Sequence, residues 1–488
     1  MFSPKTLKGY VSRRHFLEPG GYLELWRVAY PLIIMSASLT VMQFVDRMFL
    51  AWHSPEDVAA ALPSGILYFT LFSFFSVTIG FTSAVVAQLY GAKEYVSCVR
   101  AAWSGFYVAL AAGLWIALVN PLIGNFFMEH SIQIDPDIIE RQKEYFRGLR
   151  FSGVFVCLSA PLFAFFSGRG KTLPIAVINV ASCMVNVLLD YMFIFGKFGA
   201  PAWGIYGAGI ATTLCTLFTF LCAVVIFCTV DQQTFPTLSC KKLHWAYVRR
   251  LFEFGTPAGM QVFFDVGAFT LVVMLIGRLP ADAQSATTIA LTINNMCFVP
   301  LLGMSDATAI VVGQYIGRNR KEVSRRTTYR AFRMATLYMI CGGIIYLSIP
   351  HLLAGVFAPD TPSEKVNFDT VVHYCRLILA CAAFYNFFDA MKYIFMSALR
   401  GAGDTKVVFL ISFCGAWGIM VPGILILILW LNASVLTVWL FLTFYIMLEA
   451  SFICWRFRSG KWRNIELVKS ERLVLETPVE EYVPNRTI

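Results

Sequence analysis

The chain has 488 residues, of which 58% are hydrophobic and only 14% are charged. Soluble proteins keep about a quarter of their residues charged, so this composition excludes an ordinary soluble protein. The net charge of +10 could suit a nucleic-acid partner, but the Lys and Arg residues cluster between apolar runs and form no basic stripe. We therefore expect a membrane protein that binds no nucleic acid.

Twelve mostly apolar runs follow one another along the chain, and each is long enough to cross about 30 Å of hydrocarbon as a helix. Lipid offers no partner to backbone N–H and C=O groups, so such runs must be helical. The sequence predicts an all-α, polytopic membrane protein. Its predicted spans are 24–51, 58–90, 95–126, 140–166, 172–196, 203–231, 245–276, 283–315, 324–356, 367–398, 405–431 and 433–457.

Basic residues collect in alternate loops, and such loops usually face the cytoplasm. The loops at 53–57, 129–137 and 358–365 lean acidic, so we place them outside. With the basic leader before residue 24, this pattern predicts a multi-pass protein of the cell inner (cytoplasmic) membrane with both termini in the cytoplasm. The basic residues of the inner loops are Lys93, Arg100, Arg169, Lys171, Lys241, Lys242, Arg249, Arg250, Arg318, Arg320, Lys321, Arg325, Arg326, Arg400 and Lys406.

The two halves of the chain resemble each other. VVAQLYG at 85–91 recurs 226 residues later as VVGQYIG at 311–317, and Pro31 recurs as Pro257 at the same offset. The segment 169–172 also matches 400–405, with a small insertion. Three matches in the same order indicate duplication. Six spans per half is an even number, so both halves enter the membrane from the same side and the repeats are parallel.

The repeat predicts two six-helix lobes around a central cleft. The expected divisions are a cytoplasmic leader (1–23), an N-lobe (24–231), a cytoplasmic linker (232–244), a C-lobe (245–457) and a cytoplasmic tail (458–488). The prolines Pro31 and Pro257 lie at equivalent places in the first span of each lobe, where a proline kinks a helix and can serve as a hinge.

Ionisable side chains inside a membrane cost about 2.5–3.5 kcal/mol on insertion scales and indicate function by default. Several acids lie within the predicted spans, among them Asp46, Asp190, Asp265, Asp306, Asp389 and Glu449. Asn186 precedes Asp190 by one helical turn and shares its face. The acids do not follow the repeat, because Asp46 corresponds to Val272 and Asp265 to Leu39. We therefore expect separate ion or substrate chemistry in each lobe.

Basic neighbours leave structural alternatives open for two of these acids. Lys392 follows Asp389 at the i+3 position and could neutralise it in a structural salt bridge. Arg47 follows Asp46 directly, but adjacent helical residues point about 100° apart, which disfavours a direct pair. The sequence leaves open the roles of Arg47, Lys392, Asp306 and Glu449.

Motifs for soluble chemistry are missing from the sequence. There is no GxxxxGK[ST] phosphate-binding loop and no HExxH zinc motif. The 13 cysteines include no CxxC pair and lie mostly within apolar runs. We therefore expect no enzymatic activity and no cofactor beyond a coupling ion.

Four segments carry a specific resemblance to a known family: QFVD around Asp46, NVLLDYMFIFG at 186–196, GAGIAT at 207–212, and FYNFFDA with RGAGDT at 384–405. With twelve spans in two parallel halves, the chain resembles the multidrug and toxic compound extrusion (MATE) transporters. This resemblance implies an efflux antiporter with a V-shaped central cleft, driven by inward movement of H⁺ or Na⁺.

The resemblance also assigns roles to residues. It implies that Asp46 couples transport to the cation and that Asn186, Asp190 and Thr212 complete an N-lobe polar cluster. Tyr385 and Asp389 resemble the C-lobe cation site of one branch, in which Asp265 takes the place of a glutamate. Na⁺ could bind at Asp46 and Asp190 or at Asp265 and Asp389, and the choice between H⁺ and Na⁺ stays open.

The expected mechanism is competition for a buried carboxylate. Desolvation disfavours its charged form, whereas a lipophilic cation stabilises that form, so ion and drug exclude each other. The expected partners are small lipophilic or cationic substrates and membrane lipid, with no obligate protein partner, so we expect a monomer. The alternatives are a flippase for lipid-linked or polar metabolites and, from another class, a channel or non-transporting receptor.

Overall fold

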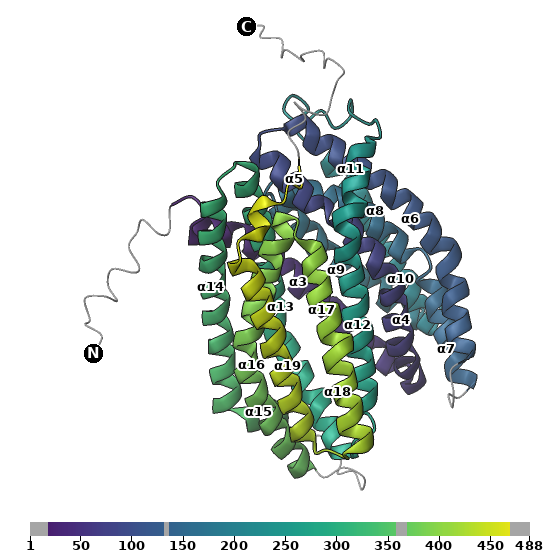
Figure 1. Ribbon diagram of the computed structural model, residues 1–488. Helices are drawn as coiled ribbons and strands as arrows, with labels where there is room; N and C mark the ends of the chain where they lie inside the picture. The colour runs from purple at the N-terminus through teal and green to yellow at the C-terminus, as the bar shows by residue number, and fades with distance from the viewer. Residues whose placement is uncertain (1–17, 131–135, 358–367, 469–488) are drawn as a thin grey trace, which may run out of the picture. The chain divides into compact units, whose positions relative to one another are not determined.

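The computed structural model describes residues 18–130, 136–357 and 368–468, and every regular element within these ranges is a helix (Figure 1). Within this described part of the chain, twelve helical segments are long and apolar enough to cross a membrane. The prediction of an all-α, polytopic membrane protein is therefore confirmed. Most of the basic leader, part of the predicted outer loop at 129–137, all of the one at 358–365, and most of the predicted cytoplasmic tail lie outside the described residues.

The helices of the first repeat follow the predicted spans closely. They are α3 (Tyr22–His53), α4 (Pro55–Gly80), α5 (Thr82–Gly91), α6 (Tyr95–Glu129), α7 (Pro136–Gly148), α8 (Ser152–Gly168), α9 (Leu173–Phe195) and α10 (Gly204–Cys228). The predicted spans 58–90 and 140–166 each consist of two helices, α4 with α5 and α7 with α8, joined by short breaks.

The second repeat contains more local irregularity. Its elements are α11 (Trp245–Arg250), η1 (Leu251–Gly255), α12 (Thr256–Ile276), α13 (Ala281–Gly317), α14 (Lys321–Ser348), α15 (Pro350–Gly355), α16 (Phe368–Ala402), α17 (Thr405–Gly415), η2 (Ala416–Met420), α18 (Val421–Leu425), η3 (Ile426–Trp430), α19 (Val435–Arg458) and η4 (Lys461–Asn464). The predicted end of the ninth span at 356 is wrong, because α14 ends at Ser348 and Pro350, which cannot donate a backbone hydrogen bond, starts a separate helix.

Contacts divide the chain into two compact units. Of the described residues, unit 1 contains those within 1–41, 257–312 and 322–462, and unit 2 contains those within 42–256, 313–321 and 463–488. In unit 1, α16 packs along α19 around a large apolar core that includes Ile378, Ile424 and Trp439. In unit 2, α8 packs against α6 and α10. Large apolar side chains that stay exposed, such as Leu122 and Trp430, suit contact with lipid.

The duplication is visible in the backbone as well as in the sequence. Lys93 and Asn319, 226 residues apart, both adopt a left-handed conformation that is uncommon outside glycine, with φ of 64° and 57°. The hydrogen bonds around them also repeat at that offset. The N–H of Glu94 donates to the Leu89 carbonyl, as the N–H of Arg320 donates to the Tyr315 carbonyl. The second and eighth spans therefore end in the same turn.

The loop after the fourth span corresponds to other residues of the second repeat than the sequence comparison predicted. Gly170 and Gly403 both have positive φ, at 75° and 92°, so they occupy equivalent turns. Arg169 is therefore equivalent to Ala402 in the second repeat, and the predicted match of Arg169 with Arg400 is wrong. The insertion in the second repeat hid this shift, because both loops contain an Arg–Gly pair.

Asp404, in the same loop of the second repeat, binds Arg456 near the C-terminal end of α19. Arg456 donates from Nε to Asp404 Oδ2 at 2.7 Å and from Nη2 to Oδ1 at 3.2 Å. Asp404 is 3% exposed and Arg456 is 14% exposed. The pair is therefore bidentate and largely desolvated, which makes the loss of one partner costly.

Replacing Arg456 by Ala is expected to destabilise unit 1 by about 3–5 kcal/mol, because the Asp404 carboxylate stays buried without its partner. Thermal unfolding of the detergent-solubilised protein should show this as a lower melting temperature. Arg458→Ala, at an exposed position two residues later, is the matched control and should leave the melting temperature unchanged. Equal melting temperatures for the two variants would show that the pair contributes nothing to stability.

Candidate functional site

Two carboxyl groups of unit 2 lie against each other, Asp46 on α3 and Asp190 on α9. Their side chains lie close enough for the two carboxyl groups to interact directly. Asp190 is fully buried and Asp46 is half-buried. Arg47, next in sequence, is exposed and acts on Asp46 only through longer-range electrostatics. The two acids that the sequence placed in different spans are thus brought together, and we call them the acid pair.

Asn186 lies beside the acid pair on the inward face of α9. It is fully buried, and neither its Oδ1 nor its Nδ2 has a hydrogen-bond partner among the described residues. Both carboxyl oxygens of Asp190 and Oδ1 of Asp46 are likewise buried and accept no hydrogen bond from another described group. Buried polar atoms of native proteins almost always have partners, so a cluster of unpartnered ones indicates a binding site.

The helical period explains why these side chains meet. Ser182, Asn186 and Asp190 recur every four residues and therefore share one buried face of α9. Ser182 fixes this face against α10, because its Oγ lies 2.6 Å from Thr219 Oγ1 and 3.2 Å from the Cys215 carbonyl. Asp190 is thus carried by a helix whose buried face is hydrogen-bonded to α10.

Tyr145 on α7 is a neighbour of the acid pair that the sequence did not predict. It interacts electrostatically with both Asp46 and Asp190. The tyrosine lies in an amphipathic stretch with several charged residues, so no local pattern separates it from a surface residue. Thr212, predicted to belong to the cluster, donates its hydroxyl to the Ala208 carbonyl of its own helix at 3.0 Å.

Asp57 forms a second polar contact of unit 2, at the start of α4. It is fully buried, accepts a hydrogen bond from Arg141 of α7, and lies 2.6 Å from Nδ1 of His53 at the end of α3. The contact joins the helix that carries Asp46 to the helix that carries Tyr145. The sequence assigned residues 53–57 to an acidic outer loop and gave no sign of this contact.

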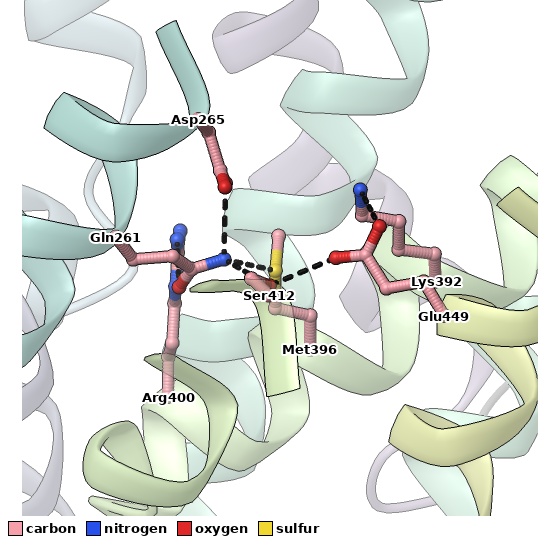
Figure 2. Close-up of polar contacts among 7 residues, drawn as sticks. All are labelled: Gln261, Asp265, Lys392, Met396, Arg400, Ser412 and Glu449. Carbon is pink, nitrogen blue, oxygen red and sulfur yellow. Dashed lines mark hydrogen bonds and ion pairs between the residues drawn. The ribbon is translucent and has the colours of Figure 1, made fainter. Parts of the chain in front are cut away.

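Unit 1 contains a continuous polar network that joins four helices (Figure 2). Lys392 Nζ on α16 lies 2.6 Å from Glu449 Oε2 on α19, and Ser412 of α17 donates to Glu449 Oε1 at 2.9 Å. Gln261 of α12 donates to Ser412 Oγ at 3.0 Å. We call this set the second-repeat network. Its members are Gln261, Asp265, Lys392, Met396, Arg400, Ser412 and Glu449.

Gln261 connects the remaining members of the second-repeat network. Its Nε2 donates to Asp265 Oδ2 at 3.4 Å and lies 3.1 Å from Met396 Sδ, while its Oε1 accepts from Arg400 Nη2 at 2.9 Å. Asp265, which has no basic residue within one turn of its own helix, interacts electrostatically with Lys392 and Arg400 of α16.

Asp389 and Tyr385 lie one turn apart on α16, and both are buried. Lys392 forms its ion pair with Glu449, 57 residues away, and acts on Asp389 through longer-range electrostatics. The i+3 salt bridge considered from the sequence is therefore not the pairing that the structure shows. Asp306 is exposed and faces Arg400.

The two predicted hinge prolines have different surroundings. Pro31 lies inside α3, which runs unbroken from Tyr22 to His53. Pro257 is the second residue of α12 and follows the π-helical turn η1. A π-helical turn is one way in which a helix adjusts before a residue that cannot donate its backbone N–H.

Comparison with known proteins identifies the family to which this chain belongs. The MatE family model matches residues 31–192 and 257–426. The chain is 27% identical over 447 residues to the probable multidrug resistance protein NorM of Bradyrhizobium diazoefficiens, covering 90% of this chain and 93% of NorM. It is 26% identical to the multidrug resistance protein MdtK of Edwardsiella ictaluri, covering 82% of this chain and 86% of MdtK.

Solved structures agree with this fold. A structure described as the outward-facing conformation of a multidrug resistance MATE family transporter of the MOP superfamily superposes with a TM-score of 0.80 at 18% identity, covering 91% of this chain and 96% of that one. A MOP superfamily transporter from Pyrococcus furiosus gives the same TM-score at 19% identity, covering 92% and 98%. Since the family model matches both repeats, the chain belongs to the MatE family of multidrug and toxic compound extrusion transporters.

Proposed function

We propose that this protein is a secondary antiporter of the cell inner membrane, with both termini in the cytoplasm, that exports cationic or amphiphilic drugs in exchange for protons. The names of NorM and MdtK support drug export, and family membership favours a transporter over a channel or receptor. Exchange takes place at the acid pair, Asp46 and Asp190.

The close approach of two buried carboxyl groups without other hydrogen-bond partners among the described residues is the observation that carries this proposal. Two desolvated carboxylates this close cannot both stay ionised, so we expect one of them to hold a proton. With Asp190 fully buried, water cannot screen the repulsion that loss of the proton would create. The pair therefore favours H⁺ over Na⁺ as the coupling ion.

Competition at the acid pair gives antiport directly. A cationic drug near the ionised pair stabilises the negative charge and opposes protonation, whereas a bound proton removes the charge that attracts the drug. Because Asp46 is on α3, the change of charge acts on a long helix that also contains Pro31. Alternating access in two-repeat transporters follows from movement of one repeat against the other.

Ethidium export from proteoliposomes under imposed gradients tests the proposal. We expect an inward-directed proton gradient to drive export and a Na⁺ gradient at constant pH to drive none. Asp46→Asn should abolish the proton-driven export, because a single carboxyl cannot form the shared-proton pair. Export that persists in Asp46→Asn, or that follows the Na⁺ gradient alone, would reject the proposal.

The alternative of a flippase for polar or lipid-linked cargo would require free positive charge at a binding site. The Pyrococcus furiosus neighbour is described as having a binding pocket of reversed polarity. Here the two basic residues of the second-repeat network are both engaged, Lys392 by Glu449 and Arg400 by Gln261. The structure therefore favours cationic over anionic cargo.

A further inference from the structure

We propose that Lys392 is a built-in cation that takes the place of a monovalent metal ion among the carboxylates of the second repeat. A protein that holds an ammonium group there has no place for Na⁺ at Asp265 and Asp389. Ion exchange is then confined to the acid pair, a consequence that rests on the proposed function, whereas the occupancy itself does not.

The position of Lys392 is fixed by an ion pair with Glu449. Its ammonium group reaches across from α16 to Glu449 on α19 at 2.6 Å, and the two side chains are 13% and 1% exposed. Ser412 satisfies the second oxygen of Glu449. A buried ion pair with its remaining atoms hydrogen-bonded stays charged, because separating it would leave an uncompensated charge inside the protein.

Lys392 also faces the other carboxylates of this region. Asp265 on α12 and Asp389 on α16 both interact electrostatically with its ammonium group. A second cation at these carboxylates would lie beside a resident positive charge. Repulsion between two such charges at an effective dielectric constant near 20 weakens binding on the order of a hundredfold or more.

Arg400, near the end of α16, supplies a second positive charge to the acids of this region. It donates to Gln261, and it interacts electrostatically with Asp265 and Asp306. The titratable groups that face Lys392 and Arg400 are the acids Asp265, Asp306, Asp389 and Glu449 and the tyrosines Tyr393 and Tyr445. The resident cations thus lie among the four acids singled out from the sequence in the spans of the second repeat.

The acid pair has no comparable resident cation. Arg47 is exposed and makes only a longer-range interaction with Asp46. Asp190 is buried and interacts with Asp46, and among the described residues it forms no ion pair with a basic side chain. The chain therefore supplies its own cation to one acid cluster and leaves the other to exchange a mobile one.

Equilibrium binding of radioactive Na⁺ to purified, detergent-solubilised protein tests the occupancy. All samples carry Asp190→Asn, so that Na⁺ bound at the acid pair does not contribute. With Lys392 present we expect no saturable Na⁺ binding. Lys392→Gln should create a saturable site, because the repulsion is removed and Glu449 is released. Its Kd should be lower, by on the order of a hundredfold or more, than that of any Na⁺ binding by the protein with Lys392.

Two further variants make the result decisive. Lys392→Arg keeps the positive charge and should bind no Na⁺, while Lys392→Gln with Asp389→Asn should lose the binding that Lys392→Gln gains. Failure of correctly folded, monodisperse Lys392→Gln protein to bind Na⁺ would overturn the proposal. So would Na⁺ binding to the protein with Lys392 intact that Asp389→Asn abolishes, a result that needs no variant of Lys392 to fold. Neither outcome depends on transport, so the proposed function can fail or hold separately.

Discussion

Cells that produce the Asp190→Asn variant are expected to be as sensitive to ethidium as cells that lack the transporter. Asparagine is nearly isosteric with aspartate and can still hydrogen-bond to Asp46, so the helices should pack as before. What is lost is the second carboxyl group, and with it the shared proton and the negative charge that attracts a cationic drug. Drug accumulation in an efflux-deficient host measures the effect, with the amount of membrane-inserted protein determined by immunoblot.

Asp231→Asn is the matched control for this prediction. Asp231 is an exposed acid of the linker after α10, and its pKa is lowered by hydrogen bonds from Thr234 and from the backbone of Gln233. Its replacement removes one negative charge from the same unit without touching the acid pair, so drug resistance should be retained. Normal resistance in Asp190→Asn cells with normal protein levels would contradict the assigned role of the pair.

Alanine at Gly91 or Gly317 is expected to destabilise the protein strongly. These glycines end the two copies of the repeated motif, and each packs against the backbone of the other copy. A Cβ at Gly91 would lie 2.0 Å from the Gln314 carbonyl oxygen, and a Cβ at Gly317 would lie 1.9 Å from the Gln88 carbonyl oxygen. Because both obstacles are backbone atoms, the helix ends must separate, and overpacking of this kind costs about 1–3 kcal/mol or more.

Gly80 provides the control for this pair of glycines. It lies in the same membrane span as Gly91, and a Cβ there would meet no atom within 4 Å. Gly80→Ala should leave the melting temperature unchanged or raise it slightly, since alanine restricts the unfolded chain. Melting temperatures of the detergent-solubilised variants measure the difference, and equal values for Gly80→Ala and Gly317→Ala would contradict the close packing described here.

The duplicated motif illustrates which features of the fold could be predicted from the sequence. The match of 85–91 with 311–317 predicted parallel repeats, and the shared left-handed turns at Lys93 and Asn319 confirm them in the backbone. The helix positions were predictable because an apolar segment that crosses the hydrocarbon must satisfy its backbone hydrogen bonds internally, as a helix does. The reciprocal contact of Gly91 and Gly317 was not predictable, because a repeat indicates two similar segments and says nothing of whether they touch.

Partner choice within the polar clusters was the part that the sequence could not supply. Local spacing correctly placed Asn186 and Asp190 on one face, since helical geometry fixes neighbours three and four residues apart. The same rule suggested Asp389 for Lys392, whose partner is Glu449 on another helix. Tyr145 and the Asp57–Arg141 contact were missed for the same reason, because nothing local indicates which helices pack together.

Proton release on drug binding tests the central claim most directly. Ethidium added to purified, detergent-solubilised protein in weakly buffered solution should release protons, detected with a pH indicator, because the drug displaces the proton shared by Asp46 and Asp190. The account predicts release from the wild-type protein and none from Asp46→Asn or Asp190→Asn. Drug binding to the wild-type protein without proton release would contradict it.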